Sequence, residues 1–207
     1  MVLFASLLSF AAQTRAQSAI HNTDNNIRLP INSAVCQKYY YPGYSDVISR
    51  IAYEEYRKYY QHSFRDNKTP YNNYNGEPWC ASFAVWVYQK AGFSVPSEPL
   101  TTRSRGLIEL FAANGIARGK TTFFTEPEWA APGDIIVWKR NVDGQGHTGI
   151  VIENDCRNRI VKTIEGNAEG GQIRAVSYTY SGINTRFKIE GGTQGGFSLY
   201  GFGRWVQ

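Results

Sequence analysis

The sequence is poor in the residues that build metal sites and nucleic-acid interfaces. It holds three cysteines and three histidines, too few and too scattered for a zinc site. Lysine and arginine outnumber aspartate and glutamate by only 22 to 17, and they form no basic run. Nucleic acid is therefore not expected as a partner. The small positive excess is typical of a solvated surface or of weak attraction to an anionic polymer.

Long apolar segments, repeats and linkers are also absent. After residue 16 no stretch is long and apolar enough to cross a bilayer, so no membrane span is expected. No internal repeat and no interdomain linker is found along the 207 residues. With 42% hydrophobic and 14% aromatic residues, a chain of this length is expected to form one globular domain with a buried core.

The start of the chain is a different kind of segment. Residues 1–12 form one short apolar block, and small residues with Ala-x-Ala-like spacing follow at 14–17. This pattern predicts a signal peptide over 1–16, although no positive residue precedes the block. A non-cleaved anchor and an ordinary buried segment are the alternatives. We therefore expect a secreted or periplasmic protein whose mature part, 17–207, is a single domain with an irregular N-terminal arm at 17–44.

Helical periodicity comes first along the chain, and strand periodicity follows it. Apolar residues at helical spacing predict helices at 45–61, 80–91 and 102–113. Beyond residue 132 the period is two, and the predicted strands are 135–138, 147–152, 160–165, 173–178 and 199–206. Helices followed by strands with short turns are typical of an α+β fold, here with the helices packed on an antiparallel sheet of roughly five strands.

One cysteine lies where a loop becomes a helix. Cys80 follows Pro78-Trp79 and opens a segment that is apolar nearly all round, which predicts a central buried helix. The N-terminus of a helix presents free N–H groups and a partial positive charge, and both favour the nucleophilic thiolate over the thiol. Cys80 is therefore the candidate nucleophile.

A cysteine nucleophile needs a base, and the base needs a third group that orients it. Of the three histidines, His21 lies in the N-terminal arm and His62 at the end of a helix. His147 instead opens a predicted strand after a glycine-rich turn. A residue at the start of a strand lies at the rim of the sheet, where it can face a helix N-terminus. His147 is therefore the candidate base.

The third predicted strand ends in Glu165-Gly166-Asn167. Residues two apart on extended backbone point the same way, so both polar side chains can reach an imidazole on the neighbouring strand. Glu165 would accept a hydrogen bond from His147, and Asn167 would fix or shield that contact. A solvated carboxylate at a strand end and an ordinary turn asparagine are the alternatives for the two residues taken singly.

The two remaining cysteines fit an exported protein in which one pair is oxidised. Cys36 lies in the N-terminal arm and Cys156 follows a predicted strand. A bridge between them would tie the arm to the sheet. Two unpaired thiols are the alternative.

Five sequence blocks occur in an order that is more specific than any block alone. They are Trp79-Cys80-Ala81-x-Phe83-Ala84, Pro132-Gly133-Asp134-Ile135-Ile136-Val137, Gly146-His147-Thr148-Gly149-Ile150-Val151, Ile164-Glu165-Gly166-Asn167 and Gly201-Phe202-Gly203-Arg204. Together, over about residues 75–206, they resemble the CHAP family, the cysteine- and histidine-dependent amidohydrolases/peptidases.

The resemblance implies a papain-like fold and hydrolysis of an amide bond in peptidoglycan, either between muramic acid and L-alanine or within the stem or cross-bridge peptide. Cys80 would attack the carbonyl and His147 would pass its proton to the leaving amine. Glu165 and Asn167 would orient the imidazole. The backbone N–H of Cys80 would be one oxyanion donor, and the preceding loop would supply the second, for which the candidates are Asn73, Tyr74 and Asn75.

The chain also departs from the family pattern. Some members bind calcium in the loop before the cysteine, but Glu77 is the only carboxylate at 71–77, so neither a metal nor another cofactor is expected. No wall-binding repeat is found, so we expect the domain itself to engage peptidoglycan. A monomer is expected. Nothing in the sequence identifies an immunity or inhibitor protein as a partner.

Two other functions fit the same residues. One is a papain-like cysteine hydrolase or acyltransferase that acts on an amide outside the cell wall. The other is a catalytically idle wall-binding module, which would be marked by the loss of the nucleophile or the base. Both Cys80 and His147 are present.

Overall fold

The computed structural model describes residues 44–95, 121–140, 146–181, 183, 185–186 and 197–205. Within these ranges the chain forms two α-helices, α2 (Tyr44–Lys58) and α3 (Cys80–Lys90). Three short 3-10 helices accompany them, namely η2 (Arg65–Asn67), η3 (Pro70–Asn72) and η4 (Pro127–Trp129).

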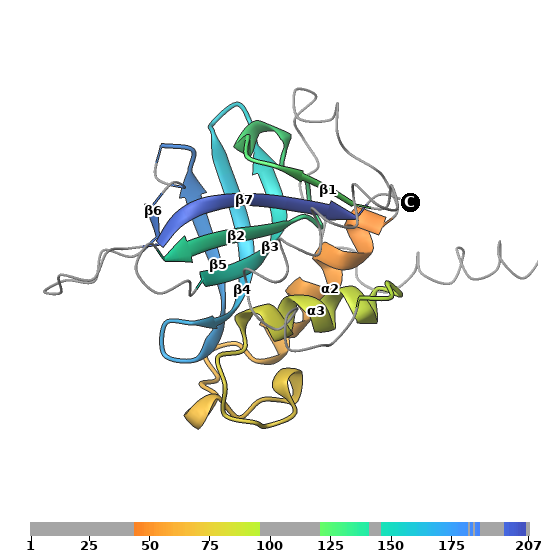
Figure 1. Cartoon of the computed structure of the whole chain (residues 1–207), viewed down its shortest axis with the longest axis vertical. Coiled ribbons are helices and arrows are strands. Elements are labelled where there is room, and N and C mark those ends of the chain that lie inside the picture. The colour runs from red at the N-terminus through yellow and green to blue at the C-terminus, as the bar shows by residue number, and fades with distance from the viewer. Residues whose placement is uncertain are drawn as a thin grey trace, which may run out of the picture. The chain divides into compact units, whose positions relative to one another are not determined.

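The described strands form one antiparallel sheet. They are β1 (Thr121–Phe124), β2 (Ile135–Arg140), β3 (Gly146–Asp155), β4 (Ile160–Ala168), β5 (Gln172–Thr179), β6 (Thr185–Arg186) and β7 (Phe197–Trp205). Their order is β1-β7-β2-β3-β4-β5, and β6 pairs with β7. Figure 1 shows α2 and α3 together on one side of this sheet. The predicted α+β fold, with helices packed on an antiparallel sheet, is confirmed and is consistent with a papain-like architecture.

Some predicted elements differ from the structure. The described residues form seven strands, where the sequence predicts roughly five. The two additional strands are β1 with four residues and β6 with two, which are too short to show a period of two in the sequence. The helix predicted at 45–61 ends at Lys58, and the chain then reaches a left-handed conformation at Gln61, where φ is 61°. The predicted signal peptide, the arm as far as residue 43 and the helix predicted at 102–113 lie outside the described residues.

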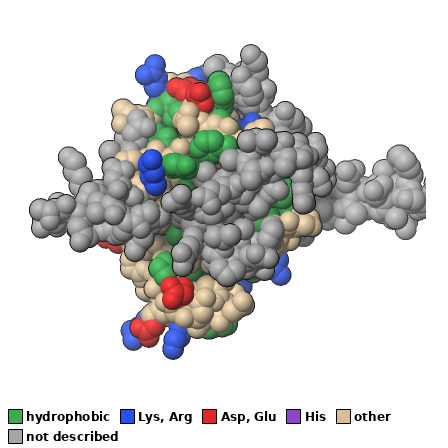
Figure 2. Space-filling model, in the orientation of Figure 1, with side chains coloured by type: hydrophobic (Ala, Val, Ile, Leu, Met, Phe, Trp, Pro, Cys, Tyr) green, Lys and Arg blue, Asp and Glu red, His purple; other side chains and the backbone are tan. Residues whose placement is uncertain are grey.

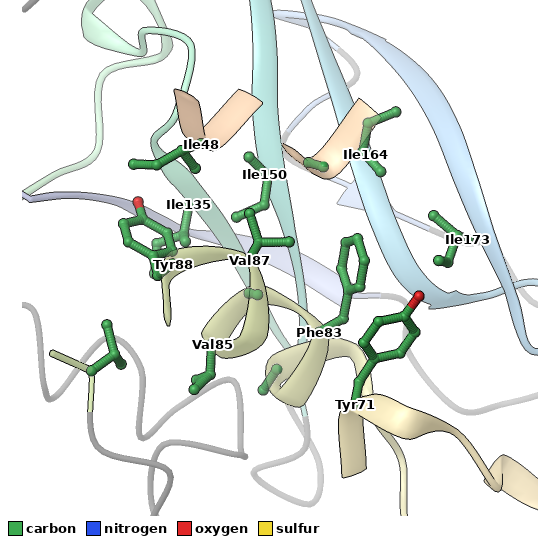
Figure 3. Close-up of a cluster of buried hydrophobic side chains, with 14 of the residues drawn as sticks. Ile48, Tyr71, Phe83, Val85, Val87, Tyr88, Ile135, Ile150, Ile164 and Ile173 are labelled. Atoms are coloured by element: carbon green, nitrogen blue, oxygen red, sulfur yellow. The ribbon is translucent and has the colours of Figure 1, made fainter. Parts of the chain in front are cut away.

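The larger hydrophobic core lies between the helices and one face of the sheet. Figure 3 shows Phe83 and Val87 of α3 pointing toward Ile150 and Ile164 of the sheet. Eight of the eleven residues of α3 are buried, as expected for a central helix with apolar residues nearly all round. This packing holds the first turn of α3 against the strands.

A second, smaller core lies on the opposite face. Alternate residues of β2 divide between the two cores, with Ile135 in the first and Ile136 in the second. This alternation follows from the period of two in an extended strand. The remaining buried members of the second core are Ala130, Trp138, Val151, Val161, Ile183 and Phe202.

A buried ion pair joins the turn before β2 to β7. The Arg204 Nε donates to Asp134 Oδ1 at 2.8 Å, and its Nη2 donates to Oδ2 at 2.7 Å. The same Nη2 reaches the carbonyl oxygen of Trp129 at 2.5 Å, and the Ala131 N–H donates to Asp134 Oδ2 at 2.7 Å. Two of the blocks noted in the sequence, Pro132-Gly133-Asp134 and Gly203-Arg204, thus meet in a structural contact.

The described surface carries dispersed charge. Figure 2 shows lysine and arginine side chains standing apart on the visible described surface, with no single basic patch. Among the described residues, no helix has the length and apolar character needed to cross a membrane.

Candidate active site

Cys80 is the first residue of α3. Trp79 occupies the N-cap position, and its side chain makes no capping hydrogen bond. Cys80 is not part of a disulfide, and the residue is only 6% exposed. A sulfur at this position lies in the positive end of the helix dipole, next to N–H groups that no capping side chain occupies, which favours the thiolate.

The first turn of α3 is pressed against β4 at Gly166. A Cβ atom placed on this glycine would lie 2.6 Å from Cβ of Phe83 and 2.7 Å from Cζ3 of Trp79, far inside normal contact distance. The helix can therefore approach the strand only because residue 166 has no side chain. The contact brings Cys80 alongside the strand that carries Glu165.

His147 is the second residue of β3, so the strand begins one residue earlier than predicted. His147 is buried, and its ring lies 5.9 Å from the ring of Trp138, its pairing partner on β2. The imidazole hydrogen-bonds with the Cys80 side chain, and its Nε2 lies 3.1 Å from Glu165 Oε2. The structure thus brings the predicted nucleophile, base and orienting carboxylate into one connected chain.

The surroundings of His147 favour its protonated form. Burial alone would lower the pKa of the imidazole, because a charged ring is poorly solvated there. The negative charge and hydrogen bond of Cys80, followed by the hydrogen bond and charge of Glu165, outweigh burial and raise the pKa above its ordinary value. A thiolate paired with an imidazolium is the state that this arrangement supports.

Glu165 is completely buried, and its carboxylate contacts polar groups of three described residues. Its Oε2 faces His147, while its Oε1 accepts hydrogen bonds from Thr163 Oγ1 and from the Tyr178 hydroxyl, each at 2.8 Å. Thr163 and Tyr178 are not among the site residues predicted from the sequence. Thr163 could have been found, because it lies two residues before Glu165 on the same strand. Tyr178 could not, because its position depends on the register of β5.

A glycine also makes room for this carboxylate. A Cβ atom on Gly149 of β3 would lie 2.7 Å from Cγ of Glu165. Glu165 therefore extends toward His147 across the backbone of the neighbouring strand. Position 149, two residues after His147, is therefore a glycine because any side chain there would collide with Glu165.

The strand alternation that was expected to point Glu165 and Asn167 in the same direction does not hold at Asn167. The pairing of β4 with β5 changes register between Glu165 and Ala168, and Asn167 has a φ of 51°. The backbone here is not extended, so spacing alone does not aim Asn167 in the direction of Glu165. The orienting role of this half-buried asparagine stays a prediction.

The three candidates for the second oxyanion donor lie in a tight loop after η3. Asn73 and Tyr74 have left-handed φ values of 52° and 58°, and both side chains are exposed. Asn75 is also exposed, and its Oδ1 accepts from the Glu77 N–H at 2.9 Å. The choice among these residues stays a prediction.

Two other predictions concern a disulfide and a metal, which was not expected. Cys156 follows β3 as expected, but Cys36 lies outside the described residues, so the bridge between them stays a prediction. Within the described ranges, no three His, Cys, Asp or Glu side chains are grouped in a way that could hold a metal ion.

The comparison with protein families agrees with the geometry. Residues 72–167 match the family model of the CHAP domain. No curated protein sequence matches the chain. The matched region contains Cys80, His147, Glu165 and Asn167.

Proposed function

With a CHAP domain at residues 72–167 as the premise, we propose that this chain is a cysteine-dependent hydrolase that cuts an amide bond in peptidoglycan. CHAP domains are generally amidases or peptidases that act on this polymer. The observation that carries the proposal is the buried connection from the thiol of Cys80, through the imidazole of His147, to the carboxylate of Glu165.

The first half of the reaction follows from these contacts. The Cys80 thiolate attacks the carbonyl carbon of the amide, and a C–S bond forms. The oxyanion accepts a hydrogen bond from the backbone N–H of Cys80 and from a second donor in the loop at 73–75. The C–N bond then breaks as the His147 imidazolium gives its proton to the leaving amine. A thioester on Cys80 and a neutral imidazole remain.

Water completes the cycle. Neutral His147 takes a proton from a water molecule, whose oxygen attacks the thioester carbon. The C–S bond breaks, the carboxylic acid product leaves, and the thiolate–imidazolium pair is restored. Glu165 stabilises the imidazolium in both halves and keeps its ring oriented.

The setting of the enzyme is part of the proposal. The predicted signal peptide at 1–16 would export the chain to the periplasm or the medium, where its peptidoglycan substrate lies. The full sequence has a net charge of +5, and removal of the signal peptide with Arg15 would leave +4, which would favour weak attraction to an anionic cell wall. We propose that the protein acts as a monomer on either the muramoyl–L-alanine bond or a bond of the stem or cross-bridge peptide.

Mass spectrometry of digested peptidoglycan tests the function most directly. The protein should release soluble fragments, and each cut should leave a new amine on one product and a new carboxylate on the other. Cys80→Ser, checked for native circular dichroism, should release none. Release by both proteins would contradict the cysteine mechanism. If the wild type cuts only other amides, or transfers the acyl group to an amine, the substrate assignment fails. If it cuts nothing and only sediments with the wall, the binding-module alternative is supported.

A further inference from the structure

The carboxylate of Glu165 is held on the side away from His147 by two hydroxyl groups. Thr163 Oγ1 and the Tyr178 hydroxyl both donate to Oε1 at 2.8 Å. We propose that Tyr178 and Thr163 are positioning residues, which keep Glu165 charged and aimed at His147 so that the imidazolium can form. This inference rests on the proposed function of Cys80 and His147.

The sheet register explains why these three side chains meet. Thr163 and Glu165 are two apart on β4 and share a face, on which Val161 also lies. Tyr178 of β5 pairs with Val161, so its side chain projects from the same face and extends along β4 to Glu165. No loop is involved, and both hydroxyl groups are therefore fixed by regular strand backbone.

The two donors have a chemical consequence at the other oxygen. A carboxylate with no exposed surface must be stabilised by hydrogen bonds, because water cannot reach it. With Oε1 occupied by two hydroxyl groups, Oε2 is left facing the N–H of His147 at 3.1 Å. Hydrogen bonds to the charged form of a carboxylate favour that form, and a charged Glu165 in turn favours the imidazolium.

Tyr178 also contacts the aromatic side chain that borders the imidazole. Its ring lies 5.2 Å from that of Trp138, which lies 5.9 Å from the ring of His147. Tyr178, Trp138, His147 and Glu165 therefore form a closed circuit of contacts. Tyr178 thus contacts two neighbours of the His147 imidazole, namely the carboxylate of Glu165 and the indole of Trp138.

Three substitutions test the inference. Tyr178→Phe removes one hydroxyl and keeps the ring contact with Trp138. Thr163→Val removes the other hydroxyl and keeps the shape, while Thr163→Ser retains the hydroxyl and serves as the conservative variant. Tyr180→Phe is the matched control, because its hydroxyl donates to Asn154 Oδ1 at 2.6 Å, near the end of β3 opposite to His147. Thermal unfolding of each variant shows how much stability is lost.

Two readouts separate positioning from stability. The first is kcat and KM on peptidoglycan fragments. The second needs no substrate, and is the rate at which iodoacetamide alkylates Cys80 as a function of pH, with Cys80→Ser as the blank. The titratable groups facing His147 are Cys80 from α3 and Glu165 from β4, and Tyr178 from β5 faces Glu165. Alkylation at mildly acidic pH therefore reports the thiolate that the imidazolium stabilises.

We expect Tyr178→Phe and Thr163→Val each to lower kcat about tenfold at unchanged KM, and to lower Cys80 alkylation at mildly acidic pH. Thr163→Ser and Tyr180→Phe should keep both wild-type values. If Tyr178→Phe and Thr163→Val are folded and match the wild type in kcat and in the alkylation profile, the inference is overturned. If the wild type cuts no peptidoglycan but the alkylation profiles differ as expected, the proposed substrate fails and the positioning role stands.

Discussion

Two carboxylates are buried among the described residues, one in the turn before β2 and one on β4, and they have different partners. Asp134 is 2% exposed and Glu165 is fully buried. Asp134 pairs with Arg204, which holds it through two hydrogen bonds and does not release its proton in proteins. Glu165 pairs with His147, whose imidazole gains and loses a proton near neutral pH and contacts a thiol.

The difference shows that the partner, and not burial, decides what a buried carboxylate does. Beside a guanidinium, the charge fixes one arrangement of backbone and joins η4, β2 and β7. Beside an imidazole, the same kind of charge controls a proton that can move during a reaction. Substitutions at the two sites should therefore separate loss of stability from loss of catalysis.

Removal of the titratable partner should have the largest effect. His147→Ala deletes both the proton acceptor for Cys80 and the partner of Glu165, and kcat/KM for peptidoglycan should fall about a thousandfold or more. His62→Ala is the control, because His62 is exposed and packs only against the rings of Tyr59 and Phe64 among the described residues. Near-full activity in His147→Ala would show that the base is wrongly assigned.

Removal of the guanidinium should change stability instead. Arg204→Met leaves Asp134 buried without its cation, and the free energy of unfolding should fall by about 3–5 kcal/mol. The double variant Asp134→Asn/Arg204→Met should lose less, because no uncompensated charge remains. Denaturant unfolding measures both. Below their transitions, the folded variants should keep wild-type kcat/KM, and a specific loss of kcat/KM would contradict the structural role.

A neutral isostere of the carboxylate that contacts His147 should have a smaller effect than loss of the proposed base. Glu165→Gln keeps an oxygen that can accept from His147 but removes the charge that stabilises the imidazolium. We expect kcat/KM to fall about 10- to 100-fold, less than in His147→Ala. Initial rates of the two variants, measured side by side, check the order. A larger loss in Glu165→Gln than in His147→Ala would contradict it.

The smallest expected effect is on the pH dependence of stability. The pKa of His147 is raised above its ordinary 6.5, so the folded state binds this proton more tightly than the unfolded state does. The resulting stabilisation is complete below pH 6.5 and is lost as pH rises through the folded pKa. Unfolding free energies of the wild type and His147→Gln should therefore converge with rising pH. A difference that stays constant across this range would show that the imidazole is not stabilised as a cation.

Much of the proposed catalytic site could be predicted because its signals in the sequence are local. Cys80 stands between a loop signal and a run of helical periodicity, and His147 stands between a glycine-rich turn and a strand. The direction of the Glu165 side chain toward His147 follows from strand alternation and from the pairing of neighbouring strands. The inferences for Cys80 and His147 need only a few adjacent residues, and the inference for Glu165 adds only the pairing of two consecutive strands.

The remaining features depend on contacts between distant segments. The pairing of Val161 with Tyr178 puts a hydroxyl beside Glu165, and no local pattern encodes that register. The register change next to Asn167 likewise has no clear signal beyond a Gly-Asn pair. The ion pair of Asp134 with Arg204 joins residues 70 apart in the sequence, and neither residue identifies the other there.

The contact at Gly166 makes the activation of Cys80 depend on the tertiary structure. Trp79 and Phe83 meet this strand with no space left between them, so the sulfur comes next to its imidazole only when the helix has docked on the sheet. Before docking, the chain carries an ordinary thiol and an ordinary histidine on separate segments. The thiol of Cys80 is therefore activated only in the folded state. In an unfolded or partly folded chain it lacks the imidazole that activates it.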